Sequence, residues 1–274
     1  MKEAVFISAF LIFATYGNVL RSSVLTPQSL PKPRILNGQQ ATLGQFPWQV
    51  AILTINSLLN QTTFCGGALI SEEWVLTSAH CIDGSVYSVV YSGTVDLNDP
   101  QRTLSLAETH IVHENFTVDF FSYEYDIGLI KLNEPLIFDE TTKSISLAEE
   151  ELEAGTEVTI SGFGHTSGED GNDTNTLLNY IVVPTMNTSE CGRYLYEADT
   201  PGIICTFFNN GDDSVIYNPC IGDGGSPLVV DAGTNPVHVG SFSFLSSFGC
   251  DASYPAAHTR TASYREWIKE KTGV

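Results

Sequence analysis

The sequence predicts an all-β protein that is closed by one helix. From Ile35 onward, short apolar or alternating runs are separated by Gly, Asn, Asp and Ser. Many short strands with turns between them are typical of a β-barrel or a β-sandwich. The chain has 274 residues, enough to bury a large core, and this length is as consistent with one all-β unit as with two smaller domains. The clearest runs span residues 48–55, 67–76, 87–91, 127–132, 158–161 and 227–230.

The final helix is predicted close to the C-terminus. Ser263 and Glu266 have the spacing of a capping box. After Ser263, the side chains of Tyr264, Trp267 and Ile268 fall on one helical face, which we expect to be buried.

The N-terminus reads as a targeting segment. Lys2 precedes an apolar run over residues 4–16, and Gly17 is a small residue near a cleavage point. The run is short for a bilayer span, and no later stretch reads as a membrane anchor. We therefore expect a signal peptide over 1–17, a short propeptide over 18–34 and one domain over 35–274, in a secreted, extracellular protein. The alternative for the apolar run is a buried first helix.

Cysteines and glycosylation sequons fit the same compartment. Six cysteines, an even number in an exported chain, indicate three disulfides rather than a metal site. Asn-x-Ser/Thr sequons occur at Asn60, Asn115, Asn172 and Asn187, and each is weak evidence alone.

The formal net charge is −20. Such a chain should repel nucleic acid and anionic lipid and should favour basic partners. The other interpretation of this charge is solubility alone.

Four motifs follow one another in fixed order. Residues 34–38 read Arg-Ile-Leu-Asn-Gly, 76–81 Leu-Thr-Ser-Ala-His-Cys, 126–132 Asp-Ile-Gly-Leu-Ile-Lys-Leu, and 220–228 Cys-Ile-Gly-Asp-Gly-Gly-Ser-Pro-Leu. Together they resemble the trypsin/chymotrypsin family of serine proteases over about residues 35–274. The resemblance implies two antiparallel six-stranded β-barrels with a C-terminal helix and an active site in the cleft between the barrels. It also implies the disulfides Cys65–Cys81, Cys191–Cys205 and Cys220–Cys250.

The resemblance identifies two members of a catalytic triad, whereas the third, the serine, is missing from this chain. His80 and Asp126 match the general base of the family and the residue that orients it. The family turn reads Cys-x-Gly-Asp-Ser-Gly-Gly-Pro, whereas this chain has Gly224 where the serine belongs. Cys220 and Pro227 fix the register on both sides, so no gap restores a serine.

Ser226 is the alternative nucleophile. It lies two residues beyond Gly224, and two extended residues span roughly 6–7 Å. A general base must approach the proton it removes to about 3 Å, so we expect Ser226 to be a structural serine.

Other parts of the machinery match the family. The backbone N–H groups of Gly222 and Gly224 supply an oxyanion hole without any side chain. By resemblance, a trypsin-like protease cuts after Arg34, and the new amine of Ile35 then pairs with Asp223.

The substrate-facing walls depart from the family. The base of the primary pocket falls at Asn218, which offers no carboxylate to Arg or Lys. Leu245 and Ala256 replace wall glycines, and the branched side chain of Leu245 should narrow the pocket. His110 and His113 read as surface histidines, and residues 116–125 as a loop with packed aromatics or a docking patch.

The sequence thus predicts a secreted, catalytically inactive serine protease homologue, without a metal or cofactor, that acts as a cofactor, decoy or regulator in a proteolytic cascade. Its expected partners are proteases or their zymogens. One alternative is an active endopeptidase using Ser226, and another is a module whose cleft captures ligands without cutting them.

Overall fold

The computed structural model describes residues 35–56, 61–118, 123–164, 176–195, 198, 200–208 and 216–274. All of these residues belong to one unit of the chain. The predicted signal peptide, the propeptide with Arg34, and the sequons at Asn60 and Asn172 lie outside the described residues.

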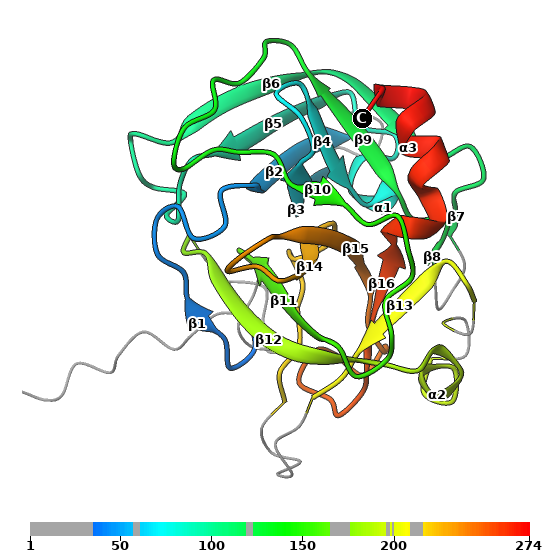
Figure 1. Ribbon diagram of the computed structural model, residues 1–274. Helices are drawn as coiled ribbons and strands as arrows, with labels where there is room; N and C mark the ends of the chain where they lie inside the picture. The colour runs from blue at the N-terminus through cyan, green and yellow to red at the C-terminus, as the bar shows by residue number, and fades with distance from the viewer. Residues whose placement is uncertain are drawn as a thin grey trace, which may run out of the picture. The chain divides into compact units, whose positions relative to one another are not determined.

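The first barrel closes from six antiparallel strands in the order β2-β3-β4-β9-β6-β5 (Figure 1). Their inward side chains form a buried core that includes Ile52, Val75 and Ile130. The strands are β2 (Gln49–Asn56), β3 (Gln61–Leu69), β4 (Trp74–Thr77), β5 (Tyr87–Ser92), β6 (Thr103–Val112) and β9 (Gly128–Leu132).

The second barrel follows the order β12-β11-β14-β15-β16-β13 and closes where β13 pairs with β12. Its core includes Ile160, Ile181 and Leu228. β1 (Gln39–Gln40) adds to β12, and β10 (Ser146–Leu147) adds to β15. The barrel strands are β11 (Glu157–Gly162), β12 (Asn179–Met186), β13 (Ile203–Thr206), β14 (Pro227–Val230), β15 (Val237–Phe244) and β16 (Ala256–Arg260). The predicted all-β fold with two six-stranded barrels is confirmed.

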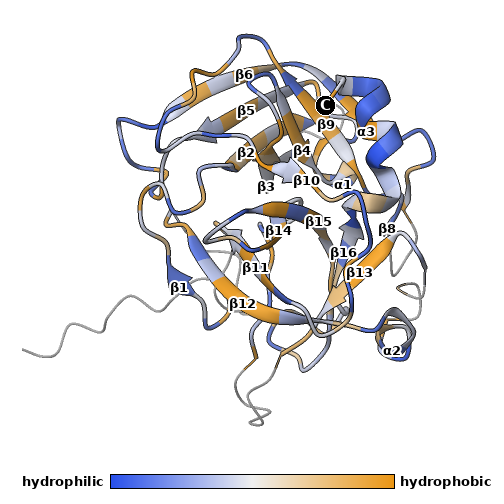
Figure 2. Ribbon diagram, in the orientation of Figure 1, coloured by the Kyte–Doolittle hydropathy of each residue, from blue (hydrophilic) through white to orange (hydrophobic). Residues whose placement is uncertain are grey.

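Helical structure is short except at the C-terminus. α1 (Ala79–Ile82) and α2 (Thr188–Cys191) are single turns, and the 3-10 turn η2 (Thr261–Tyr264) leads into α3 (Arg265–Thr272). Most of α3 is hydrophilic (Figure 2), while Ile268 is buried and Trp267 packs beside it, which confirms the predicted buried face. The capping box is wrong: the Ser263 hydroxyl donates to the carbonyl of Pro201, and the residue at the helix start is Tyr264, without a side-chain cap.

All three implied disulfides are confirmed, as Cys65–Cys81, Cys191–Cys205 and Cys220–Cys250. They tie elements of the same barrel together and constrain the unfolded chain. Among the described residues, no helix has the length and apolar character needed to cross a membrane.

Three local expectations need correction. The run over 67–76 is not one strand, because a turn separates β3 from β4. The stretch predicted as a loop contains two short strands that pair antiparallel, β7 (Thr117–Val118) and β8 (Tyr123–Glu124). His110 and His113 are partly buried, not ordinary surface histidines: His110 bonds to Ser88, and His113 stacks on Tyr125.

Candidate active site

Two neighbouring strands of the first barrel bring His80 and Asp126 together. β4 ends at Thr77, and His80 follows on the single turn α1. Asp126 stands just before β9, and β4 pairs with β9 so that Thr77 lies opposite Gly128. Residues that leave paired strands at the same end must lie close together, which is how a separation of 46 residues becomes a direct contact.

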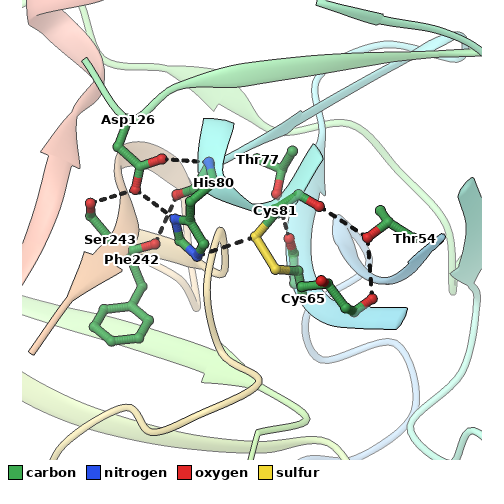
Figure 3. The surroundings of a disulfide bond; sticks show 11 residues. Thr54, Cys65, Thr77, His80, Cys81, Asp126, Phe242 and Ser243 are labelled. Atoms are coloured by element: carbon green, nitrogen blue, oxygen red, sulfur yellow. Dashed lines mark hydrogen bonds and ion pairs between the residues drawn. A yellow bond between two sulfur atoms is a disulfide. The ribbon is translucent and has the colours of Figure 1, made fainter. Parts of the chain in front are cut away.

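Asp126 is almost fully buried, and its carboxylate is satisfied by three donors (Figure 3). Its Oδ2 lies 2.8 Å from His80 Nδ1, and its Oδ1 accepts the backbone N–H of His80 at 2.9 Å. The hydroxyl of Ser243 also donates to Oδ2. This arrangement fixes the imidazole and turns Nε2 toward the cleft, which is the orienting role of the acid in a Ser-His-Asp triad.

Sequence reasoning missed three residues that hold this pair. Ser243, near the end of β15, donates its hydroxyl to Asp126 Oδ2. Thr259 donates to the backbone carbonyl of Asp126 at 2.8 Å. The ring of Tyr123 stacks on His80, with centroids 4.8 Å apart. These contacts join β8, β15 and β16 to the His80–Asp126 pair. No local sequence pattern predicts them, because they arise from the packing of the barrels.

The turn that carries Gly224 lies against His80. The carbonyl of Gly224 accepts the N–H of Gly66 at 2.7 Å, which ties the turn to the first barrel. A Cβ placed on Gly224 would lie 2.5 Å from His80 Nε2. Position 224 is thus the residue that faces the imidazole, and it carries no side chain.

The predicted oxyanion donors line the cleft. Gly222 and Gly224 both line a cavity of about 390 Å³ beside His80. Gly222 adopts φ +93°, a conformation that favours glycine. Within the described part of the chain, neither N–H group bonds to another backbone group, so both are available to an oxygen in the cleft.

Ser226, the alternative nucleophile, is buried away from the cavity beside His80. It is 0% exposed, and its hydroxyl has no hydrogen-bond partner among the described residues. Its Oγ lies against two glycines of opposite barrels, so that a Cβ on Gly66 would overlap it and one on Gly162 would approach it to 3.0 Å. The lining of the cavity beside His80 does not include Ser226.

The uncleaved chain keeps Ile35 and Asp223 buried. Ile35 is 0% exposed in the second barrel core, at φ +58°, a value that β-branched residues rarely adopt. The Asp223 carboxylate accepts the N–H groups of Gly164 at 2.7 Å and Cys220 at 2.9 Å. Burial raises the pKa of Asp223 to about 7, against the opposing effect of these two bonds. In the intact chain the nitrogen of Ile35 is an amide, so it cannot pair with Asp223 as an ammonium.

The predicted pocket residues separate into two groups. Leu245 lines the cavity beside His80, together with Ile221 and Phe244. Asn218 and Ala256 are buried and do not line it. The Asn218 side chain instead donates to the carbonyls of Cys250 and Tyr254.

The metal and glycosylation predictions each concern a few of the described residues. Among the described residues, the group with metal-ligating atoms close together is Cys65, His80 and Cys81, but both cysteines are in a disulfide and offer no thiolate. Both described sequons are exposed, and the side chain of Asn187 caps α2, whereas Asn115 follows β6.

Comparisons with known proteins agree with this geometry. The trypsin family model matches residues 35–268. Brachyurin of Leptuca pugilator is 32% identical over 88% of this chain and 99% of its own length. Collagenase of Hypoderma lineatum is 32% identical over 89% of this chain and 90% of its own length.

Two further matches extend the comparison. Serine proteinase stubble of Drosophila melanogaster is 31% identical over 88% of this chain, but only 31% of its own length is covered. A solved structure of HL collagenase superposes with a TM-score of 0.75 and 29% identity, over 88% of this chain and 99% of that one. The chain belongs to the trypsin family of serine proteases.

Proposed function

We propose that this chain is a secreted, catalytically inactive member of the trypsin family that acts by binding other proteins in an extracellular proteolytic cascade. The observation that carries the proposal is Gly224, which faces His80 and has no hydroxyl. His80 and Asp126 can orient and remove a proton only where a nucleophile supplies one. Without it, acyl transfer retains at most the binding and oxyanion contributions, roughly 10³–10⁴-fold over water.

The alternative is an endopeptidase that uses Ser226, and the names of the relatives favour proteolysis. The packing of Ser226 speaks against it. Its hydroxyl is enclosed by Gly66 and Gly162, and it does not reach the cavity that holds His80. A nucleophile and its base must lie within hydrogen-bond reach of each other, so the alternative requires the turn to rebuild.

Binding is the activity that the remaining features support. The cleft keeps a cavity of about 390 Å³ with free oxyanion donors, and Ile221 is 70% exposed at its rim. The net charge of −20 favours partners with basic surfaces. Cleavage after Arg34 by a trypsin-like protease would create an ammonium at Ile35 for the buried Asp223, so a conformational switch can persist without catalysis.

The test uses the full chain, cut after Arg34 and checked by N-terminal sequencing. The activated protein is incubated with a serine-reactive organophosphate and with peptide substrates, beside its Ser226→Ala variant. We expect no stoichiometric label and no turnover above the buffer rate in either protein. Label on Ser226 together with turnover that Ser226→Ala removes would overturn the proposal.

A further inference from the structure

A second cavity, of about 370 Å³, lies behind the His80–Asp126 pair. It is bounded by β8, by the segment leading into β13, by β16 and by η2. It shares only Tyr123 with the cavity beside His80. Its volume is in the range of pockets that bind small ligands or single side chains.

The charge on the cavity wall is negative. Glu124 and Asp126 line it, and the described residues of the wall include no Lys, Arg or His. The Asp126 carboxylate is already satisfied by His80 and Ser243, but Glu124 is exposed and forms no ion pair with any cation of the described chain. Burial is the main cause that raises the pKa of Tyr264 to about 12, and charge on neighbours, including Asp126 and Glu124, adds to it. The free carboxylate of Glu124 is thus available to a cation.

Aromatic rings form the rest of the wall. The rings of Tyr125 and Tyr264 lie 6.2 Å apart at 78°, as two walls of a corner. Tyr125 is held at φ +51° and stacks on His113 at 5.1 Å, so its ring is fixed from behind. The Tyr264 hydroxyl lies against Gly202, where a Cβ would approach it to 2.8 Å. Cations bind favourably to the faces of aromatic rings, and cages of such rings recognise them.

We propose that this cavity binds the cationic side chain of an arginine or lysine presented by a protein partner. Glu124 supplies the countercharge, and the corner of Tyr125 and Tyr264 supplies the cation–π surface. The net charge of −20 steers basic surfaces toward the molecule. The site goes beyond the function proposed above, because it does not involve position 224 and holds whether or not the domain hydrolyses peptides.

The test is an NMR titration of the full chain with three peptides, acetyl-Gly-Xaa-Gly-amide with arginine, lysine or citrulline at Xaa. Citrulline keeps the shape of arginine and removes its charge. Glu124→Gln is compared with Glu134→Gln, which removes one exposed charge after β9, outside the lining of the cavity. Tyr125→Leu is compared with Tyr87→Leu, since these tyrosines are 41% and 42% exposed.

We expect saturable shifts with arginine and lysine and none with citrulline. The dissociation constant should rise about fivefold in Glu124→Gln and in Tyr125→Leu, and it should stay unchanged in the two controls. Three results would each overturn the proposal: binding of the citrulline peptide as tightly as the arginine peptide, equal weakening by Glu124→Gln and Glu134→Gln, or binding that survives both Glu124→Gln and Tyr125→Leu. Thermal unfolding of each variant identifies any loss of binding that is due to misfolding. If Tyr125→Leu does not fold, the comparison of Glu124→Gln with Glu134→Gln tests the proposal, because both side chains are exposed.

Discussion

The imidazole of His80 reaches into the volume that a side chain at position 224 would need. A Cβ placed on Gly224 would lie 2.5 Å from Nε2 and 3.1 Å from Cε1. The ring is held by the hydrogen bond between Nδ1 and Asp126 and by the stacked ring of Tyr123. Gly224 therefore lacks both the serine hydroxyl and the space for a side chain. The His80 ring lies against it and must move to admit any Cβ.

Gly224→Ala should therefore destabilise the domain, because the new methyl group overlaps a held ring. Overpacking of this kind costs about 1–3 kcal/mol in the free energy of unfolding. The measurement is urea unfolding of the variant beside Gly233→Ala, since a Cβ on Gly233 would meet no atom within 4 Å. Equal stability of the two variants would mean that His80 moves freely and that position 224 is not crowded.

Ser226→Ala should leave the domain as stable as the wild type or more stable, by up to about 1 kcal/mol. Its hydroxyl is buried without a described partner, so removing it relieves a desolvation cost. Ser78 is the matched control, since it is equally buried but donates to the Phe242 carbonyl at 2.9 Å. Ser78→Ala should lose about 1 kcal/mol in the same unfolding assay. A loss in Ser226→Ala as large as in Ser78→Ala would show that the Ser226 hydroxyl has a partner.

Asp223 should make the uncleaved chain less stable as pH rises. Burial raises its pKa to about 7, above an unfolded value of about 4, so the folded state holds the extra proton between these values. Stability from this group is present at low pH and is lost as pH rises from about 4 to about 7, by a few kcal/mol in all. His238 and His258 oppose this trend, since burial lowers the pKa of each to about 3.

The effect of Asp223 is therefore read as a difference between wild type and Asp223→Asn at pH 4 and at pH 7. The wild type should lose stability relative to the variant over this range, while Asp83→Asn, on an exposed side chain, should show no such difference. After cleavage at Arg34 the loss should disappear, because the Ile35 ammonium then favours the charged carboxylate. A flat difference in the uncleaved chain would contradict the burial of an unpaired acid.

Much of this molecule followed from the sequence, and the exceptions share a physical cause. The four motifs led to the barrels, the disulfides and the positions of His80 and Asp126, because each motif combines a turn or strand with a chemical group. Ser243, Thr259 and Tyr123 escaped prediction because their contacts with the pair depend on how β8, β15 and β16 pack. His80 of the first barrel lies against Gly224 of the second barrel. The spacing of residues along the chain does not predict such a contact between barrels.

The start of the last helix failed for a related reason. Ser263 and Glu266 have the local pattern of a capping box, but Ser263 finds a partner in Pro201, which is 62 residues away. A tertiary hydrogen bond thus replaced a local one. The prediction for the histidines at 110 and 113 failed in the same way, because their partners come from β5, from Tyr125 just after β8, and from the C-terminal helical segment.

The missing hydroxyl at position 224 is tested most directly by Gly224→Ser. The chain is cut after Arg34, and kcat/KM on peptide substrates is measured for wild type, Gly224→Ser and Gly224→Ser with His80→Ala. We predict that Gly224→Ser raises hydrolysis by about 10²-fold or more over wild type, less than a complete triad gives because His80 must shift, and that His80→Ala removes the gain. Hydrolysis by the wild type at the rate of Gly224→Ser, or a folded and cleaved Gly224→Ser that stays silent, would contradict the account.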